Sequence, residues 1–324
     1  LAGVEGPPVL GGQGRVLLGQ GGAFGLDKVG TLHAVNGDAY GGDEPIQVSE
    51  LWYQQTFLDE KIRVKVGKMD LMIDFDLNAY ANDETSQFLN VALVNTQNIP
   101  WPDYCQGVVV AVQPVDWMYV QGAVADAQAS GRETGFNTFY HDESYTFSIF
   151  EAGLQPVWNT SWGKLPGGYR FMLWYDPRPK PVFLTTENVF RNRTGDIGFA
   201  FNMDQMLFRE NPGDDEDAQG LGVFFRYAYA HDDINLTEHF WSVGGQYQGL
   251  VPTRDDDVLG FGFVQSIIGD QARTLGLGDH PGHGEGLAGA GRAEQGLDLL
   301  AGLETLAELR DRGRLVGQRR EGGV

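Results

Sequence analysis

Alternation of apolar and polar residues is the feature that most constrains how this chain can fold. In the run Gly168–Asp176, every second residue is Tyr, Phe or Leu, and the residues between them include Arg170 and Trp174. In Gly220–Ala230 the same pattern places Leu, Val, Phe and Tyr on one face and Arg226 on the other. Successive side chains of a β-strand point to opposite faces, so a period of two residues indicates strands. We therefore predict an all-β fold whose strands have one apolar and one polar face.

Strand-like runs recur from Leu51 onward, and a length of about eight to eleven residues suits a tilted strand that crosses a bilayer. Short connections such as Leu58–Glu60 and Gln113–Asp116 alternate with long polar ones such as Ala125–Glu143 and Leu207–Gln219. This alternation of connection lengths is typical of outer-membrane barrels. The predicted strands are Leu51–Phe57, Lys61–Lys68, Gln106–Gln113, Asp116–Val124, Ser144–Gly153, Gly168–Asp176, Gly195–Met206, Gly220–Ala230, His239–Gln248 and Val258–Gln265.

The alternation itself is compatible with two kinds of β-protein. The apolar faces can pack together in a soluble sandwich or barrel, or they can meet lipid while the polar faces line a lumen. A mean hydropathy of −0.27 fits either kind, because a membrane barrel carries its apolar residues only at alternate positions. No stretch approaches the roughly eighteen consecutive apolar residues of a helical membrane span.

Charge and cysteine content exclude several function classes. A net charge of −21 argues against a nucleic-acid partner, because such proteins need a basic face. Cys105 is the only cysteine, so the sequence predicts neither an internal disulfide nor a zinc site. The acidic runs Asp214–Asp217 and Asp255–Asp257 lack the spacing of a calcium-binding loop and are interpreted as solvated loops. We predict no catalytic residue, no metal and no cofactor.

The segment Gly67–Gly107 is too long for a hairpin connection and too apolar for a disordered linker. It joins two strand-like runs, and Asn82 or Asp83 can cap a short helix that ends at Phe88. We predict that this segment is a loop with its own fold, inserted into a cavity. The apolar anchors that require burial are Phe75, Phe88, Leu89, Val91 and Leu93.

Several motifs, in order, resemble those of the carbohydrate-selective porins of the bacterial outer membrane, the OprB family. The motifs are GKMDLMIDFD, FLNVALVN, IPWPDYCQGVVVAVQP, the preceding LWYQQTFLDEKIRVKVGK, and GLVPTRDDDVLGFGF at Gly249–Phe263. The resemblance covers roughly Val35 to Ile268. It implies a closed antiparallel transmembrane β-barrel, of roughly 16 strands, in the outer membrane. It also implies passive diffusion of small, glucose-like sugars through a pore that an inward-folded loop narrows, with no enzymatic activity.

A sugar presents flat C–H faces and hydroxyl groups, so a selective pore needs aromatic faces and charged groups that form hydrogen bonds. The inserted loop and the lumen-facing strand positions supply both. The opposing interpretation is structural: Asp74 and Asp76 cap turns, and Trp101, between two prolines, packs the loop against the wall. The predicted constriction residues are Arg63, Asp70, Asp74, Asp76, Asn78, Trp101, Tyr104, Arg170 and Trp174.

The predicted partners are small sugars and outer-membrane lipid, and the sequence is compatible with a monomer or a homo-oligomer. The alternative function is a soluble carbohydrate-binding β-protein or a glycoside hydrolase, which would need two carboxylates flanking the scissile bond. The sequence contains many Asp and Glu residues but singles out no such pair.

The chain is predicted to divide into a barrel domain at residues 1–270, hard to assign before about residue 35, and an atypical tail at 271–324. The tail contains no aromatic residue, and Leu299, Leu303 and Leu306 recur at helical spacing within Arg292–Arg312. We expect the tail to be helical or disordered and to lie outside the sheet. The chain lacks a signal peptide at Leu1, and we interpret it as altered or truncated at its ends.

Overall fold

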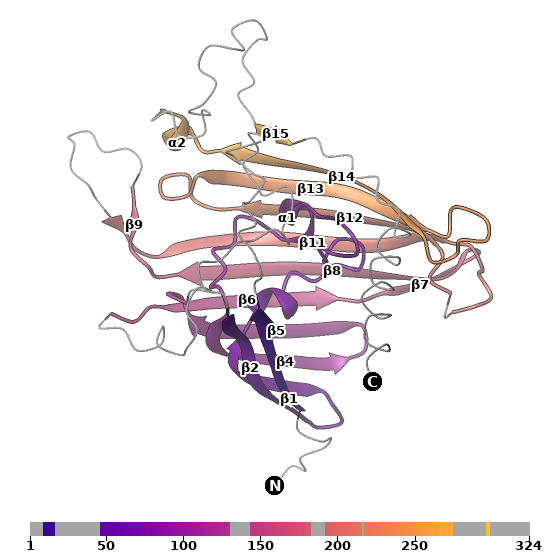
Figure 1. The fold of residues 1–324 in the computed structure, drawn as a ribbon, viewed down its shortest axis with the longest axis horizontal. Coiled ribbons are helices and arrows are strands. Elements are labelled where there is room, and N and C mark those ends of the chain that lie inside the picture. Colours follow the sequence, from indigo (N-terminus) through magenta and orange to yellow (C-terminus); the bar gives the residue numbers. More distant parts are fainter. Residues whose placement is uncertain are drawn as a thin grey trace, which may run out of the picture.

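The computed structural model describes residues 9–16, 46–129, 143–182, 192–215, 217–274 and 296–298. One antiparallel sheet of 13 strands dominates this part of the chain, and neighbouring strands follow one another in chain order (Figure 1). A separate small sheet pairs β9 (Lys180–Pro181) with β10 (Asn192–Arg193). The strands of the large sheet are β1 Val9–Val16, β2 Ile46–Phe57, β3 Ile62–Met69, β4 Cys105–Val115, β5 Met118–Asp126, β6 Thr146–Leu154, β7 Val157–Thr160, β8 Gly163–Asp176, β11 Asp196–Arg209, β12 Gly220–Tyr229, β13 Thr237–Gln248, β14 Val258–Ile268 and β15 Gly296–Asp298.

Every strand predicted from the alternation is present, with boundaries shifted by a few residues. The described strands do not form the closed barrel that the resemblance implies. The sheet has β1 at one edge and β15 at the other, and these two strands do not pair. Strand β7, which was not predicted, pairs with Gly163–Pro166 at the start of β8. No helix in the described part of the chain is long and apolar enough to cross a membrane.

Antiparallel pairing places alternate connections at opposite ends of the sheet. The connections 58–61 and 116–117 lie at one end, here called the short-turn end. The loop 70–104, the end of β5 and the start of β6 lie at the other. The prediction that Leu207–Gln219 is one of the long loops is wrong. Strand β11 continues to Arg209, so the connection shortens to residues 210–219, and strand direction places it at the short-turn end.

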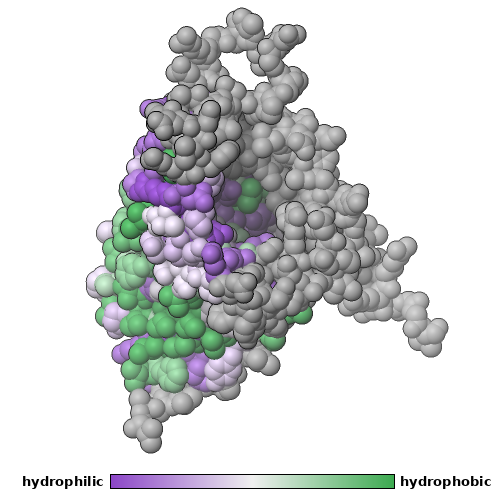
Figure 2. All heavy atoms as spheres, turned by 90° about the vertical axis from the view of Figure 1, so that its left-hand side faces the viewer, coloured by the Kyte–Doolittle hydropathy of each residue, from purple (hydrophilic) through white to green (hydrophobic). Residues whose placement is uncertain are grey.

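The two faces of the sheet have opposite polarity, and the polar face is the covered one. On β8, Phe171, Leu173 and Tyr175 are 44%, 43% and 45% exposed, whereas the alternate positions, Arg170 among them, are buried. On β3, Val66 is exposed and Lys65 is buried. In Figure 2 hydrophobic residues cover a broad part of the outer surface, and hydrophilic residues lie around the hollow beside it. A soluble sandwich requires the reverse arrangement, because its apolar faces pack in the core.

The inserted loop, residues 70–104 between β3 and β4, lies against this covered face (Figure 1). It contains the 3-10 helix η1 (Leu71–Ile73) and the short helix α1 (Val91–Val94), which contacts β13 and β14. The expected helix ending at Phe88 is instead a turn, although Asp83 does cap it by accepting from the N–H groups of Thr85 and Ser86. The helix of this part of the loop is α1, which begins at Val91 because the Asn90 side chain caps it by accepting from the N–H of Ala92.

Part of the predicted tail is described. The helix α2 (Asp270–Thr274) follows β14, and Gly296–Asp298 pairs with Val264–Ser266 of β14. For these three residues the structure differs from the expectation of a tail outside the sheet. The predicted helical stretch Arg292–Arg312 otherwise lies outside the described residues.

Candidate functional site

Ion pairs with β3 hold the beginning of the inserted loop. Asp74 binds two cations: Arg63 Nη1 lies 2.5 Å from Oδ1, and Lys65 Nζ lies 2.7 Å from Oδ2. The Lys65 ammonium also lies 4.6 Å from the centre of the Trp52 ring. The side chains of Lys65 and Asp74 are 3% and 4% exposed, so salt screens this interaction little. The charged face of β3 therefore anchors the loop where it leaves the strand.

A second cluster surrounds Asp76, whose φ of 58° lies in the left-handed region that Asp adopts more readily than most residues. Arg226 Nε donates to its Oδ1 at 3.2 Å, and Asn202 Nδ2 donates to the same oxygen at 2.6 Å. The N–H of Thr96 donates to Oδ2 at 2.7 Å. Both carboxylate oxygens of Asp76 are thus occupied by donors from β11, β12 and the loop itself.

Arg226 of β12 bonds to two further points of the loop. Its Nη1 donates to the carbonyl oxygen of Leu93 at 2.8 Å, and its Nη2 donates to that of Ala81 at 2.6 Å. A guanidinium group presents five donors in a fixed geometry, which suits it to such a junction. One side chain of the sheet therefore positions α1 and the segment around Asp76 together.

Glu151 of β6 connects the two clusters. Its Oε2 accepts from the N–H of Asp76 at 3.1 Å, and its Oε1 accepts from the Tyr119 hydroxyl at 2.7 Å and from Gln121 Nε2 at 2.9 Å. Gln121 Nε2 also donates to the carbonyl oxygen of Asp74 at 2.6 Å. Glu151 is fully buried, and these bonds offset the cost of removing its carboxyl group from water.

A third set of polar contacts lies on β8 and β11. Asp204 Oδ2 accepts from Arg170 Nη1 at 2.6 Å, and its Oδ1 accepts from the N–H of Ala79 at 3.0 Å. Asn78 Nδ2 donates to Asn202 Oδ1 at 2.7 Å. The loop is therefore bonded to the covered face from β3 across to β12.

Glycines of the sheet make room for ring and aliphatic side chains of the loop. A Cβ atom on Gly222 would lie 2.1 Å from the ring of Tyr80, a distance that no real contact reaches. The ring therefore rests directly on the backbone of β12. The pairs of this kind are Gly222 with Tyr80, Gly260 with Phe88 and Gly262 with Leu93.

The predicted constriction residues fall into a buried and a half-buried group. The buried residues, most of which make the loop contacts described above, are Asp74, Asp76, Asn78, Arg170 and Trp174. The indole of Trp174 is 1% exposed, and its ring packs over Gly198 of the neighbouring strand β11. The half-buried residues are Arg63, Asp70, Trp101 and Tyr104.

The half-buried residues of the loop lie near its two ends. Asp70 caps η1 by accepting from the N–H of Met72 at 2.9 Å. Trp101 Nε1 donates to the carbonyl oxygen of Thr96 at 3.3 Å, and its ring centre lies 6.4 Å from that of Phe147. Their roles in sugar binding stay a prediction.

Sequence reasoning placed Arg226 on the inner face but did not include it in the site, and it missed the other residues that hold the loop. The alternation could have identified them, because the missed residues are polar and lie on the same face of their strands as the other inward-facing positions. The missed residues are Lys65, Tyr119, Gln121, Glu151, Asn202 and Asp204.

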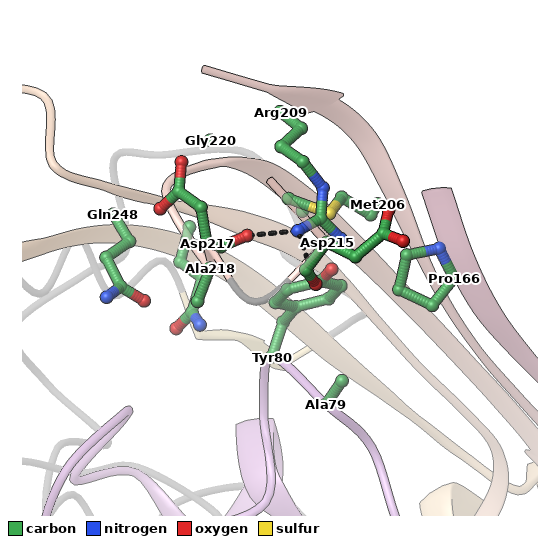
Figure 3. A pocket seen from close by; sticks show the side chains of 12 residues that line it. Ala79, Tyr80, Pro166, Met206, Arg209, Asp215, Asp217, Ala218, Gly220 and Gln248 are labelled. Atoms are coloured by element: carbon green, nitrogen blue, oxygen red, sulfur yellow. Dashed lines mark hydrogen bonds between the residues drawn. The ribbon is translucent and has the colours of Figure 1, made fainter. Parts of the chain in front are cut away.

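A pocket of about 290 Å³ lies between the loop and the short-turn end of the sheet (Figure 3). It is a small pocket by comparison with the range of about 300–1,000 Å³ typical of small-molecule sites. No part of it was predicted. The lining residues are Ala79, Tyr80, Pro166, Met206, Arg209, Asp215, Asp217, Ala218, Gly220, Gly222, Gln246 and Gln248.

Arg209 shapes one wall of this pocket. Its Nη1 donates to the carbonyl oxygens of Asp214 and Asp215, each at 3.0 Å, and to that of Asp217. Its Nη2 donates to the carbonyl oxygen of Lys164 at 3.0 Å. Arg209 is 5% exposed, and these bonds hold its guanidinium group against the β11–β12 turn.

Tyr80 forms the opposite wall. Burial, reinforced by the negative charge of Asp204, raises the pKa of Tyr80 to about 12. The hydroxyl group is therefore protonated at neutral pH and can donate a hydrogen bond. Within the described residues, no group of three or more His, Cys, Asp or Glu side chains is placed to hold a metal ion.

Comparison with known proteins places this architecture in a family. The sequence model of the carbohydrate-selective porins, OprB family, matches residues 15–303. Porin B of Pseudomonas aeruginosa is 25% identical over 277 residues, which cover 77% of this chain and 57% of that protein. Putative porin QuiX of Acinetobacter baylyi is 21% identical over 260 residues, which cover 76% of this chain and 56% of that protein. The chain thus spans somewhat more than half the length of these relatives.

A solved structure shares the fold. The high-pH structure of Pseudomonas putida OprB superposes with a TM-score of 0.63 and 20% sequence identity, covering 75% of this chain and 61% of that one. The apolar exposed face, the polar covered face and the long loop inserted between β3 and β4 agree with the family match over most of the sequence. This chain belongs to the OprB family of carbohydrate-selective porins.

Proposed function

We propose that the protein forms a pore in the bacterial outer membrane for passive diffusion of small, glucose-like sugars, and that the inserted loop narrows this pore. The observation that carries the proposal is the polarity of the sheet: its exposed face is apolar, and its covered face holds the loop through buried charges. An apolar outer face suits lipid, and a polar inner face suits a water-filled lumen.

The predicted residues take two roles in this proposal. Asp74, Asp76, Asn78 and Arg170 fix the loop, because their polar groups are already bonded. Arg63, Asp70, Trp101 and Tyr104 retain exposed surface and are the candidates for direct sugar contact. Trp174 supports the wall from within the core.

A channel accounts for the covered carboxylates better than a hydrolase does. A glycoside hydrolase needs one carboxylic acid and one carboxylate free to act at the scissile bond. In the clusters described above, Asp74, Asp76 and Glu151 are each buried and bonded to several donors. We therefore propose a passive role without catalysis.

The test is reconstitution of the full chain in planar lipid bilayers, with glucose titrated against ion current. We expect stepwise conductance that glucose reduces in a concentration-dependent way. A chain that stays monodisperse without detergent and forms no channels would contradict the proposal and favour a soluble binding protein.

A further inference from the structure

We propose that the pocket between Tyr80 and the β11–β12 turn is a binding subsite for a neutral sugar about the size of one hexose. This inference rests on the proposed function and adds to it a second contact point, separate from the residues predicted to form the constriction. It is carried by the position of the pocket, its hydrogen-bonding groups and its charge.

The pocket lies on the covered face, at the opposite end of the sheet from the one where the loop begins and ends. Gly220, Gly222 and Gln246 occupy covered-face positions of β12 and β13, and Gly222 pairs with Gln246. Residues 79 and 80 of the inserted loop close the pocket from the other side. A solute that has passed the loop would therefore meet this pocket before it leaves at the short-turn end.

The lining offers the groups that a sugar needs. The Tyr80 ring rests on Gly222 and gives an aromatic surface, against which a C–H face of a sugar can pack. Among the described residues, no hydrogen bond engages the Tyr80 hydroxyl or the side-chain amides of Gln246 and Gln248. An amide has both donor and acceptor atoms, as a sugar hydroxyl does, so either group can donate a hydrogen bond to the other.

The charge of the lining favours neutral ligands. Asp215 and Asp217 lie on the wall, whereas the buried guanidinium of Arg209 is bonded to carbonyl oxygens of the turn. Lys164 is outside the lining and pairs with Asp215 at 2.5 Å. A sugar acid would bring its carboxylate next to Asp217, while the Nη1 and Nη2 donors of Arg209 are already bonded to carbonyl oxygens, and like charges repel.

The experiment compares a double variant, Gln246→Ala with Gln248→Ala, with the unmodified chain in planar bilayers. Glucose is the probe, and glucuronate is the anionic comparison. We expect glucose to bind the variant about tenfold more weakly, the loss that two neutral hydrogen bonds would cause, while ion conductance without sugar is retained. We expect the unmodified chain to bind glucuronate more weakly than glucose.

The matched control replaces two exposed glutamines at the same end, Gln113→Ala with Gln155→Ala, and should leave glucose binding unchanged. Saturation-transfer NMR on the detergent-solubilised proteins gives a second measure of binding that does not depend on current. If the unmodified chain binds glucose and the pocket variant binds it equally well, the subsite is wrong and the pore proposal stands. If the unmodified chain neither binds nor conducts sugar, both proposals fail.

Discussion

Arg226 and Asp76 form an ion pair in which neither side chain is more than 1% exposed, with Arg226 Nε 3.2 Å from Asp76 Oδ1. The pair joins the sheet to the inserted loop at a point where no water can replace a missing partner. Burying two charges is costly, so a pair of this kind stabilises a structure only when further hydrogen bonds complete it. Here the carbonyl oxygens of Leu93 and Ala81 and the amide of Asn202 complete it.

Removal of Arg226 should destabilise the protein strongly. Arg226→Ala leaves the Asp76 carboxylate buried without its cation, and we expect the free energy of unfolding in detergent to fall by about 3–5 kcal/mol. Urea unfolding followed by tryptophan fluorescence measures this change. The control is Lys164→Ala, which removes a pair with Asp215 that is more than half exposed and should cost about 0–1 kcal/mol. Equal losses of unfolding free energy in the two variants would show that the buried Arg226–Asp76 pair contributes no more to stability than an exposed pair.

A methyl group at Gly222 should displace the Tyr80 ring. The added Cβ would approach the ring to 2.1 Å, so Gly222→Ala is expected to cost about 1–3 kcal/mol and to change the environment of Tyr80. Gly213→Ala is the control, because nothing lies within 4 Å of the Cβ position there. Thermal unfolding of both variants measures the difference, and an unperturbed Gly222→Ala protein would contradict the described docking of Tyr80.

Substitution of Trp101 tests whether the inserted loop sets the selectivity for sugars. Trp101→Ala should weaken block by glucose about fivefold, equivalent to about 1 kcal/mol, if the indole stacks on the sugar. Single-channel current with glucose titrated in is the measurement. Trp117→Ala, at an exposed turn of the short-turn end, should leave the block unchanged. An unaltered block in the Trp101 variant would shift the filter to Arg63 on the strand wall.

The turn that Asp83 caps should depend on pH. Burial acts to raise the pKa of Asp83, but hydrogen bonds from Thr85 and Ser86 outweigh it and hold the pKa below the usual value. A lowered pKa in the folded state means that the carboxylate contributes stability above the unfolded pKa and loses it as pH falls through the folded pKa. Acidification should therefore lower the protection of the Thr85 and Ser86 amides against hydrogen exchange, measured relative to the intrinsic exchange rate at each pH.

The matched variants for this turn are Asp83→Asn and Asp59→Asn. The first can still accept hydrogen bonds but cannot titrate, so the protection of its Thr85 and Ser86 amides, relative to the intrinsic rate, should lose the pH dependence of capping. The second changes an exposed turn elsewhere and should behave as the unmodified chain does. A pH dependence that survives in Asp83→Asn would assign the effect to another group.

Sequence patterns predicted the strands and their faces because a period of two residues is a local property. The outward positions of Phe171 and Leu173 and the inward position of Arg226 are confirmed for that reason. The contacts of Arg226 were not predictable in the same way, since Asp76 is 150 residues away and nothing local identifies it. The pocket combines Tyr80 with Gln246 and Gln248, which come from separate segments and meet only in the folded chain.

The distances along the sequence that the loop contacts span also constrain the order of folding. The partners of Asp76 on β11 and β12 lie 126 and 150 residues after it, so the loop cannot reach its final position until those strands have paired. Contacts of such high sequence separation form slowly, because the entropy of closing the intervening chain is lost before they contribute. The loop should consequently be among the last parts of the protein to become ordered, and a chain halted before β12 should leave the loop without its bonds to Arg226.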